Sequence, residues 1–376
     1  MAKAAFAALL ALAAACSVQA GSWPNMTVAQ MSDWFWGPFA ARLPAKDFID
    51  AVQAAQLRVY DSQGHERKIS ILSITSEFSF QGDGMWQLFL QSLANITFAH
   101  RDGRQDHLAA HLVATVMTLP NGTADSCTRA SQPYGARCVP MTCPMFTHEN
   151  YGYKTPPFYA LSFAKTLTIL DALTLGMDVF FLDGDQMFFR NPLPYFMARP
   201  NIDIMVSGDC QKREDSTPLD RFPQIGSNIG VLYLRARPVV TRAVMNWLAW
   251  LVILARSNRP SLDQSTFNEA INWMSVDLGA KSLSVAMLLG EVFSYWCMGE
   301  CGCDTTGLQF GERGRSERRG PDGMCPVAMV REWISFHVPC DGDMNQKART
   351  MRELLAMYQR LVGPVHSLSS PMHTAT

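Results

Sequence analysis

The segment Asp178-Val-Phe-Phe-Leu-Asp-Gly-Asp-Gln-Met-Phe-Phe-Arg-Asn-Pro192 ends an apolar run with two carboxylates, Asp183 and Asp185. A short apolar run of this kind is typical of a buried strand. Two carboxylates at the end of a buried strand repel each other unless a hard divalent cation neutralises them, and oxygen ligands suit Mg²⁺ or Mn²⁺. The segment therefore predicts a metal site at the edge of a sheet, of the kind that carries a diphosphate.

The Asp-x-Asp pattern is short and occurs by chance, so its surroundings have to distinguish a site from a turn. A second copy, Asp341-Gly-Asp343, follows Pro339 among polar neighbours and is typical of an ordinary turn. Only the first copy follows a buried strand and precedes a further apolar group, at residues 187–189. The metal-site interpretation of Asp183 and Asp185 is therefore favoured over a solvated turn at a strand end.

Length and composition indicate a globular protein with a sizeable core. The chain has 376 residues, of which 48% are hydrophobic and 17% charged, enough for one large domain or two small ones. A net charge of -1 gives no reason to expect nucleic acid or an anionic membrane as a partner, because both select for a basic surface.

The amino-terminal residues are typical of a secretory signal. Lys3 precedes an apolar run at residues 4–16, and Val18 and Ala20 are small residues where a signal peptidase cleaves. This run is shorter than the roughly 20 residues that span a bilayer, although whether the signal is cleaved or retained as an anchor stays open. A second apolar run, at residues 244–255, is interpreted as a buried helix. We expect the secretory pathway, either the Golgi lumen or the extracellular space, and no transmembrane span in the mature chain.

Sequons and cysteines agree with an oxidising compartment. Cys297-x3-Cys-x-Cys303 resembles a zinc cluster, but disulfides are favoured in such a compartment. Outside the signal the number of cysteines is odd, so at least one is a free thiol or pairs with another chain. The sequons begin at Asn25, Asn95 and Asn121, and the nine cysteines are at positions 127, 138, 143, 210, 297, 301, 303, 325 and 340.

Strand and helix patterns alternate along most of the chain, which predicts an α/β fold with a mostly parallel central sheet. Such a sheet binds ligands beyond the carboxyl ends of its strands, where Asp183 and Asp185 are expected. Residues 127–157 are rich in Cys, Pro and Gly and are interpreted as a disulfide-tied loop. The expected strands are 68–75, 111–119, 179–182, 202–207, 230–234 and 332–337, and the expected helices are 86–93, 157–173, 239–255, 263–274 and 348–361.

Ordered motifs in this sequence resemble the nucleotide-diphospho-sugar transferases of plants and green algae, glycosyltransferase family 77. The resemblance covers residues 155–275 well and 333–347 thinly. It implies a GT-A type, Rossmann-like domain, which we place at residues 67–362, after a signal peptide (1–20) and an amino-terminal extension (21–66) and before a disordered tail (363–376). The motifs are Lys165 in Ser-Phe-Ala-Lys-Thr-Leu-Thr-Ile-Leu170, Gly176-Met-Asp-Val-Phe-Phe-Leu-Asp-Gly-Asp185, Arg190-Asn-Pro192, Ile202-Asp-Ile204, Ser207-Gly-Asp209, Ser227-Asn-Ile-Gly-Val-Leu-Tyr-Leu-Arg-Ala236, Asp263-Gln264, Phe267-Asn268, and Phe336-His337 ahead of Gly342 and Lys347.

The family implies a retaining transferase that moves a sugar from a nucleotide diphosphate donor, usually uridine-linked, to a carbohydrate or glycoprotein acceptor. A diphosphate leaving group gains negative charge as the glycosidic bond breaks, and a bound cation such as Mn²⁺ or Mg²⁺ stabilises that charge. The resemblance implies metal ligands at Asp183, Asp185 and His337.

The resemblance also assigns roles around the donor. It implies donor contacts from Lys165, Asp183, Asn228, Gly230 and Lys347, the lysines as point charges at the phosphates. Asp263 and Gln264 match a segment near the transferred sugar and the acceptor, and no covalent nucleophile is assigned. Gly184 departs from the pattern, because the family usually has a larger residue there.

Each of these residues also has a purely structural interpretation. His337 suits a core histidine bonded to a carbonyl, and Lys165 a surface lysine on its helix. Asp263 suits a helix N-cap, for which Ser261 competes, and Asn228 with Gly230 suits a turn. His107 and His111 are spaced like a metal pair but lack a third ligand, which favours a solvated helix face.

Two other functional classes compete with the transferase. A secreted carbohydrate-binding or structural protein could keep a catalytically silent transferase scaffold, as the signal and the many cysteines would allow. A secreted metal-dependent phosphoesterase would also use paired carboxylates, but it would need more His or Asp ligands than the sequence offers.

Overall fold

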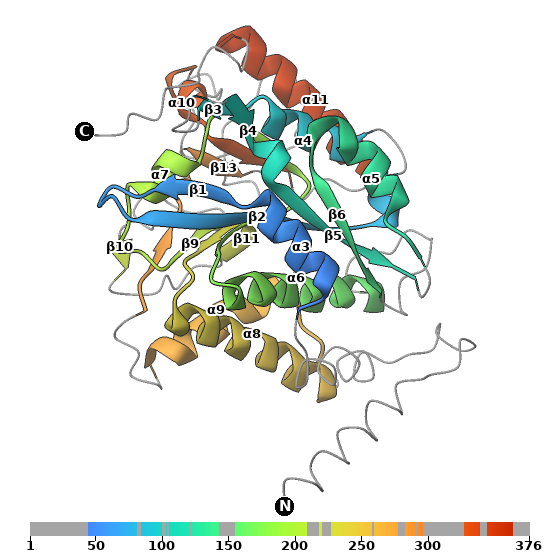
Figure 1. Ribbon diagram of the computed structural model, residues 1–376, viewed down its shortest axis with the longest axis vertical. Coiled ribbons are helices and arrows are strands. Elements are labelled where there is room, and N and C mark those ends of the chain that lie inside the picture. Colours follow the sequence, from blue (N-terminus) through green and yellow to red (C-terminus); the bar gives the residue numbers. More distant parts are fainter. Residues whose placement is uncertain are drawn as a thin grey trace, which may run out of the picture.

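The structure is a computed structural model in which helices cover both faces of a central sheet (Figure 1). It describes residues 44–80, 84–99, 103, 105–119, 122–142, 155–208, 218–219, 227–257, 259–276, 283–290, 292–295, 327–338 and 344–363. Several expectations lie outside these residues: the signal peptide, the tail, the second Asp-Gly-Asp, the sequon asparagines 25 and 121, and the cysteines other than Cys127 and Cys138.

The central sheet has the order β10-β12-β9-β11-β7-β2-β5-β6, with β1 beside β2. Its half formed by β7, β2, β5 and β6 is parallel, and β11 then runs antiparallel between β7 and β9. The α/β class predicted from the sequence is confirmed. The strands are β1 (Leu57–Tyr60), β2 (Glu66–Ser76), β5 (Leu112–Thr118), β6 (Arg137–Thr142), β7 (Asp178–Leu182), β9 (Ile204–Gly208), β10 (Pro218–Leu219), β11 (Ser227–Leu234) and β12 (Val285–Met287).

Helices α3 (Lys46–Ala55), α6 (Pro156–Thr174), α8 (Pro238–Arg256) and α9 (Asp263–Val276) cover one face of the sheet. In α8, Val240, Val244, Trp247 and Leu251 recur at helical spacing and are buried. Within the described residues α8 is the helix long and apolar enough to cross a membrane, yet this face of it packs in the core against α6 and α9. Its outer face exposes Ile253.

The opposite face carries α4 (Met85–Ala94), α5 (Asp125–Ser131) and α11 (Met344–Leu361), together with a smaller sheet of order β13-β14-β8. Aromatic rings join these parts, for example Phe189 stacked on Tyr358 at 4.1 Å between ring centroids. The remaining elements are β8 (Gln186–Phe188), β13 (Phe293–Tyr295), β14 (Ser335–His337), α7 (Leu193–Met197), α10 (Val327–Glu332), the ribbon β3 (Thr97–Ala99) and β4 (Gln105–His107), and the 3₁₀ turns η2 (Glu77–Phe80), η3 (Leu108–His111) and η4 (Gln132–Tyr134).

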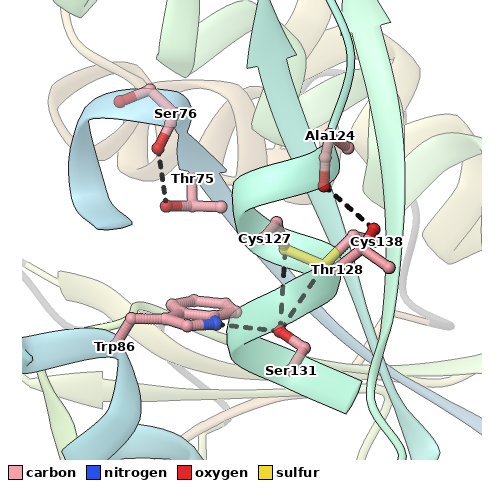
Figure 2. The surroundings of a disulfide bond; sticks show 8 residues. All are labelled: Thr75, Ser76, Trp86, Ala124, Cys127, Thr128, Ser131 and Cys138. Carbon is pink, nitrogen blue, oxygen red and sulfur yellow. Dashed lines mark hydrogen bonds between the residues drawn. A yellow bond between two sulfur atoms is a disulfide. The ribbon is translucent and has the colours of Figure 1, made fainter. Parts of the chain in front are cut away.

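The segment that we interpreted as a disulfide-tied loop is more regular than expected. Residues 127–142 contribute to α5, η4 and the strand β6, and α6 begins at Pro156, so the loop interpretation is wrong for these residues. The disulfide was expected, and Cys127 of α5 is bonded to Cys138 of β6 (Figure 2). Pro140 and the cysteine obscured the strand pattern, but β6 ends the strand order, and proline is tolerated in a strand that pairs on one side.

Two smaller differences also have physical reasons. The strand expected at 332–337 begins only at Ser335, because Glu332 ends α10. His111 does not line a solvated face: its Nδ1 lies 2.8 Å from the carbonyl of Ala55 and its Nε2 lies 3.1 Å from Asp106, so its role is structural. Gly176 has φ 75° and ends α6 in the left-handed conformation, as predicted.

Candidate active site

The Asp183-Gly184-Asp185 segment joins the two sheets, because β7 ends at Leu182 and β8 begins at Gln186. Backbone hydrogen bonds fix both ends of the segment. The Asp183 amide donates to the carbonyl of Gly230 on β11, at 2.9 Å, and the Val338 amide after β14 donates to the carbonyl of Asp185, at 3.1 Å. One carboxylate is therefore anchored to the large sheet and the other to the small one.

His337, at the end of β14, meets the carboxylates at this junction. Candidate ligand atoms of Asp183, Asp185 and His337 all lie within 4.8 Å of one another. The His337 Nε2 atom is 3.0 Å from Asp185 Oδ1, and the His337 side chain is buried. The side chain of Asp183 is 32% exposed, so the group can be reached from solvent.

Gly230 makes room for the imidazole. A Cβ atom at position 230 would lie 2.3 Å from Cε1 of His337 and 2.9 Å from both of its ring nitrogens, which is closer than atoms can pack. The His337 ring lies against this glycine, so any larger residue would displace a candidate metal ligand.

Asp185 lies between two cationic or potentially cationic groups. The Lys347 Nζ donates to Asp185 Oδ2 at 2.6 Å, opposite the contact with His337. Burial acts to raise the pKa of Asp185, but the Lys347 ammonium and the His337 imidazole together hold that pKa below its ordinary value. Asp185 is therefore an anion in the folded protein.

Lys165 connects the motif to α9. Its Nζ is 3.1 Å from Asp183 Oδ1 and 3.5 Å from Asp263 Oδ2, and it lies 4.6 Å from the centre of the Phe181 ring. Burial of the ammonium acts to lower the pKa of Lys165, but the carboxylates of Asp183 and Asp263 outweigh it and raise the pKa. The interpretation of Lys165 as a surface lysine is therefore wrong, because its side chain is only 5% exposed.

Asp183 differs from its neighbour in the motif. Burial raises the pKa of Asp183, Lys165 offsets this in part, and the negative charge of Asp185 raises it further. The pKa values of Asp183 and Asp185 are thus shifted in opposite directions. Carboxylates with shifted pKa values in one cluster are frequent at functional sites.

The other predicted residues lie around this core. Asp263 is the first residue of α9, and its Oδ1 accepts from Ser162 Oγ at 3.1 Å. Gln264 follows it and is partly exposed. Asn228 Oδ1 accepts from the Gly230 amide at 2.9 Å, and both residues lie within β11, where the pairing with β9 is irregular, so the turn interpretation is wrong.

Sequence reasoning missed two contributors. Ser162 lies one turn before Lys165 on α6 and also accepts from the Asp263 amide at 3.2 Å, and the i, i+3 spacing to Lys165 was a signal for it. Trp86 packs beneath Gly184, where a Cβ atom would lie 3.3 Å from the indole ring. No local pattern in the sequence connects Trp86 with the motif.

The residues present fit a hard divalent cation. Carboxylate oxygens are the ligands of Mg²⁺ and Mn²⁺, and Mn²⁺ also accepts an imidazole nitrogen. Asp183 and Asp185 offer the oxygens, and His337 offers the nitrogen within the same 4.8 Å.

A family model described as nucleotide-diphospho-sugar transferase matches residues 115–351, which contain all of the site residues described above except Trp86. The chain belongs to the nucleotide-diphospho-sugar transferase family. The arabinosyltransferase XEG113 of Arabidopsis thaliana is 27% identical over 127 residues, a match that covers 32% of this chain and 19% of that protein. The chain thus matches about a fifth of the length of this relative.

Solved structures of other glycosyltransferases are more distant. Mouse xyloside xylosyltransferase 1 is 14% identical, with a TM-score of 0.39 over 72% of this chain and 98% of its own. A glycosyltransferase involved in glycosylation of the major capsid of PBCV-1 is 12% identical, with a TM-score of 0.36 over 75% and 98%. The strand order, a Rossmann-like parallel half joined to a mixed half, agrees with the GT-A type expected for this transferase family.

Proposed function

We propose that this protein is a metal-dependent retaining glycosyltransferase that moves a sugar from a nucleotide diphosphate, UDP above all, to a glycoprotein or polysaccharide acceptor. The observation that carries the proposal is the convergence of Asp183, Asp185 and His337 within 4.8 Å at the carboxyl end of β7. Membership in the nucleotide-diphospho-sugar transferase family supports the reaction class.

In this reaction the bond between the sugar C1 and the diphosphate oxygen breaks, and its electron pair goes to the diphosphate. A new bond forms between C1 and the acceptor hydroxyl oxygen, whose proton passes to the departing phosphate oxygen. A divalent cation such as Mn²⁺ or Mg²⁺, when bound, would supply the positive charge that stabilises the diphosphate leaving group. Asp183, Asp185 and His337 would hold that cation, and the family resemblance implies that the Asp183 carboxylate would also contact the ribose.

The lysines supply fixed positive charge beside the same group. Lys347 is 20% exposed, and through its contact with Asp185 it lies where a phosphate can be reached. Lys165 is more deeply buried and acts on the donor by holding Asp183 and Asp263. Charges that are already oriented cost no reorganisation when the leaving group becomes anionic.

The acceptor side of the site is assigned to α9. Asp263 and Gln264 begin this helix, next to Lys165, and would position the transferred sugar and the acceptor hydroxyl. Asn228 and Gly230 line the donor side through β11. No side chain is assigned as a covalent nucleophile, because the departing phosphate oxygen can take the acceptor proton.

The proposed compartment is the secretory pathway, in the Golgi lumen or outside the cell. The Cys127–Cys138 disulfide is consistent with it, since disulfides persist in oxidising compartments. Donor and acceptor are the proposed partners, and a nucleic acid is not among them.

The test is a donor screen with the purified full chain. UDP-sugars are incubated with Mn²⁺ or with EDTA, and release of UDP is measured with and without oligosaccharide acceptors. We expect slow donor hydrolysis that requires Mn²⁺ and accelerates with the right acceptor. Asp47→Asn, a neutralised carboxylate exposed on α3, is the matched control for substitutions in the motif.

Three results would contradict the proposal. Turnover that is unchanged in EDTA would show that the reaction does not require a divalent cation. Sugar binding without any turnover would support the silent scaffold, and cleavage of simple phosphodiesters without a sugar would support a phosphoesterase.

A further inference from the structure

Gly184, between the two carboxylates, does not owe its identity to backbone conformation. Its φ is not in the left-handed region that favours glycine. A Cβ atom at this position would instead lie 3.3 Å from both Cε3 and Cζ3 of Trp86, a tight contact with a rigid ring. The indole thus occupies the space that a side chain at position 184 would take. The packing of Trp86 is therefore a physical reason for a glycine at this position.

The Trp86 ring is held from several sides. Its side chain is fully buried on α4, and the rings of Phe80 and Phe89 lie 5.6 and 5.3 Å from it between centroids. The indole Nε1 donates to Ser131 Oγ at 3.0 Å (Figure 2). A tryptophan with its one polar atom satisfied has a single well-defined orientation in a core.

Ser131 is itself fixed by the disulfide. It is the last residue of α5 and fully buried, and its Oγ lies 3.7 Å from the sulfur of Cys127 and 3.5 Å from that of Cys138 (Figure 2). Because the disulfide ties α5 to β6 of the central sheet, the position of Ser131 follows that sheet. A continuous series of contacts therefore leads from the sheet edge through Ser131 and Trp86 to Gly184.

We propose that Trp86 is a positioning residue that sets the geometry of the Asp183 and Asp185 carboxylates by packing against the backbone of Gly184. The ends of the segment are fixed by hydrogen bonds to Gly230 and from Val338, and the ring fixes its middle. A glycine without such a neighbour has the largest conformational freedom of any residue. The proposal rests on the proposed function only in assigning a divalent cation to these carboxylates.

The test is a double-mutant cycle of Trp86→Phe and Gly184→Ala on the full chain. Mn²⁺ affinity is measured by electron paramagnetic resonance without donor, and stability by urea unfolding. Phenylalanine keeps an aromatic side chain, so the variant folds, but it is shorter than the indole and leaves room for a methyl group at position 184. Each single variant is expected to weaken Mn²⁺ binding about 10-fold, the lower end of the range for residues that orient metal ligands.

The double variant decides the outcome. If the ring and the glycine are complementary, the methyl group fills the space that the ring leaves, and the double variant binds Mn²⁺ at least as tightly as either single variant. Losses that multiply to about 100-fold would overturn the inference, because independent sites add their free energies. Phe98→Leu removes a similar ring from the same core cluster and is expected to lower stability without changing Mn²⁺ affinity.

Ser131→Ala tests the hydrogen bond separately. Loss of the acceptor should weaken Mn²⁺ binding about 3-fold, within the range of coupling between residues of one network. Unchanged Mn²⁺ affinity in Ser131→Ala would overturn the part of the inference that concerns α5. If the wild-type chain binds no Mn²⁺, the metal assignment of the proposed function fails, and the inference with it; if it binds Mn²⁺ and the cycle is additive, only the role of Trp86 fails.

Discussion

The two ends of β7 carry aspartates in contrasting surroundings. At the start of the strand, the Asp178 carboxylate accepts hydrogen bonds from Arg67 at 2.8 and 2.6 Å, from the Tyr233 hydroxyl at 2.7 Å and from the Ala236 amide at 2.7 Å. Its side chain is only 2% exposed. At the other end, Asp183 contacts Lys165, and Asp185 contacts His337 and Lys347. The Asp183 side chain there is 32% exposed.

The two ends differ in how the negative charge is balanced. Asp178 has partners for both oxygens from β2 and β11, so adding a ligand there would require breaking bonds that hold three strands together. The carboxylates at the carboxyl end repel each other and rely on lysines and an imidazole, so an added cation improves their environment. The proposed cation site is therefore at the end where two carboxylates lie close together, rather than at the end where one carboxylate meets two arginines.

The largest expected effect comes from Asp185→Asn. Removing one of the proposed metal ligands should lower Mn²⁺-dependent UDP release about 1,000-fold, because charge stabilisation of the leaving group is lost. Urea unfolding should change less than in Asp178→Asn, since Lys347 is 20% exposed and can turn to solvent. Activity within 10-fold of that of Asp47→Asn would contradict the assignment.

Asp178→Asn should lower the stability of the protein and leave its Mn²⁺ affinity unchanged. Neutralising the carboxylate leaves Arg67 and the buried Arg235 without their anion, and breaking a buried pair costs about 3 kcal/mol of unfolding free energy. The Mn²⁺ affinity of the folded fraction should be unchanged. A stability loss no larger than that of Asp185→Asn, measured in the same urea series, would remove the contrast between the two ends.

Gly230→Ala tests the space beside His337. A methyl group there must displace the imidazole, with an overpacking cost of about 2 kcal/mol. Mn²⁺ binding should weaken as the ring moves. The double variant Gly230→Ala, His337→Ala relieves the clash, so it should regain the stability lost in Gly230→Ala while Mn²⁺ binding stays weak. If the double variant does not regain stability, the methyl group at position 230 does not clash with the His337 imidazole, and the explanation is wrong.

Tyr233→Phe gives the smallest effect and concerns pH. Burial and then the charge of Asp178 raise the pKa of Tyr233 well above its ordinary value, so the phenol stays neutral in the folded state. The unfolded chain releases this proton near pH 10, so the contribution of Tyr233 to stability is lost as the pH rises beyond that value. The phenylalanine variant should lose about 1 kcal/mol at neutral pH.

The variant should also show a shallower fall in stability above about pH 10. Urea midpoints between neutral and alkaline pH measure both effects. Tyr60→Phe, at an exposed tyrosine on β1, serves as the control and should leave the alkaline fall as it is. A slope equal to that of the wild type would contradict the role of Tyr233.

Local sequence patterns predicted the fold class and the motif but not how the site is assembled. Asp183 and Asp185 could be predicted because an apolar strand directly precedes them. The β6 strand was missed because Pro140 interrupts its pattern, and a sheet edge tolerates that interruption. His337 was predicted as a metal ligand only from the family resemblance, because a lone histidine at the end of a short strand does not by itself indicate a ligand.

Contacts between distant segments explain the rest. The fit of Gly230 around His337 and of Gly184 over Trp86 each joins residues far apart in the chain, and a glycine alone does not indicate which ring lies against it. The full pairing of Asp178 likewise depends on Arg67 and Tyr233 meeting across the sheet. Packing of this kind follows from the fold and cannot be read from a single segment.

The backbone anchors of the motif have a mechanical consequence. The backbone of Asp183 is hydrogen-bonded to β11, and the backbone of Asp185 is hydrogen-bonded to the residue after β14. The distance between the two carboxylates therefore depends on how the large and small sheets lie relative to each other. A substitution that moves one sheet relative to the other would therefore change the distance between the two carboxylates, even if it touched neither of them.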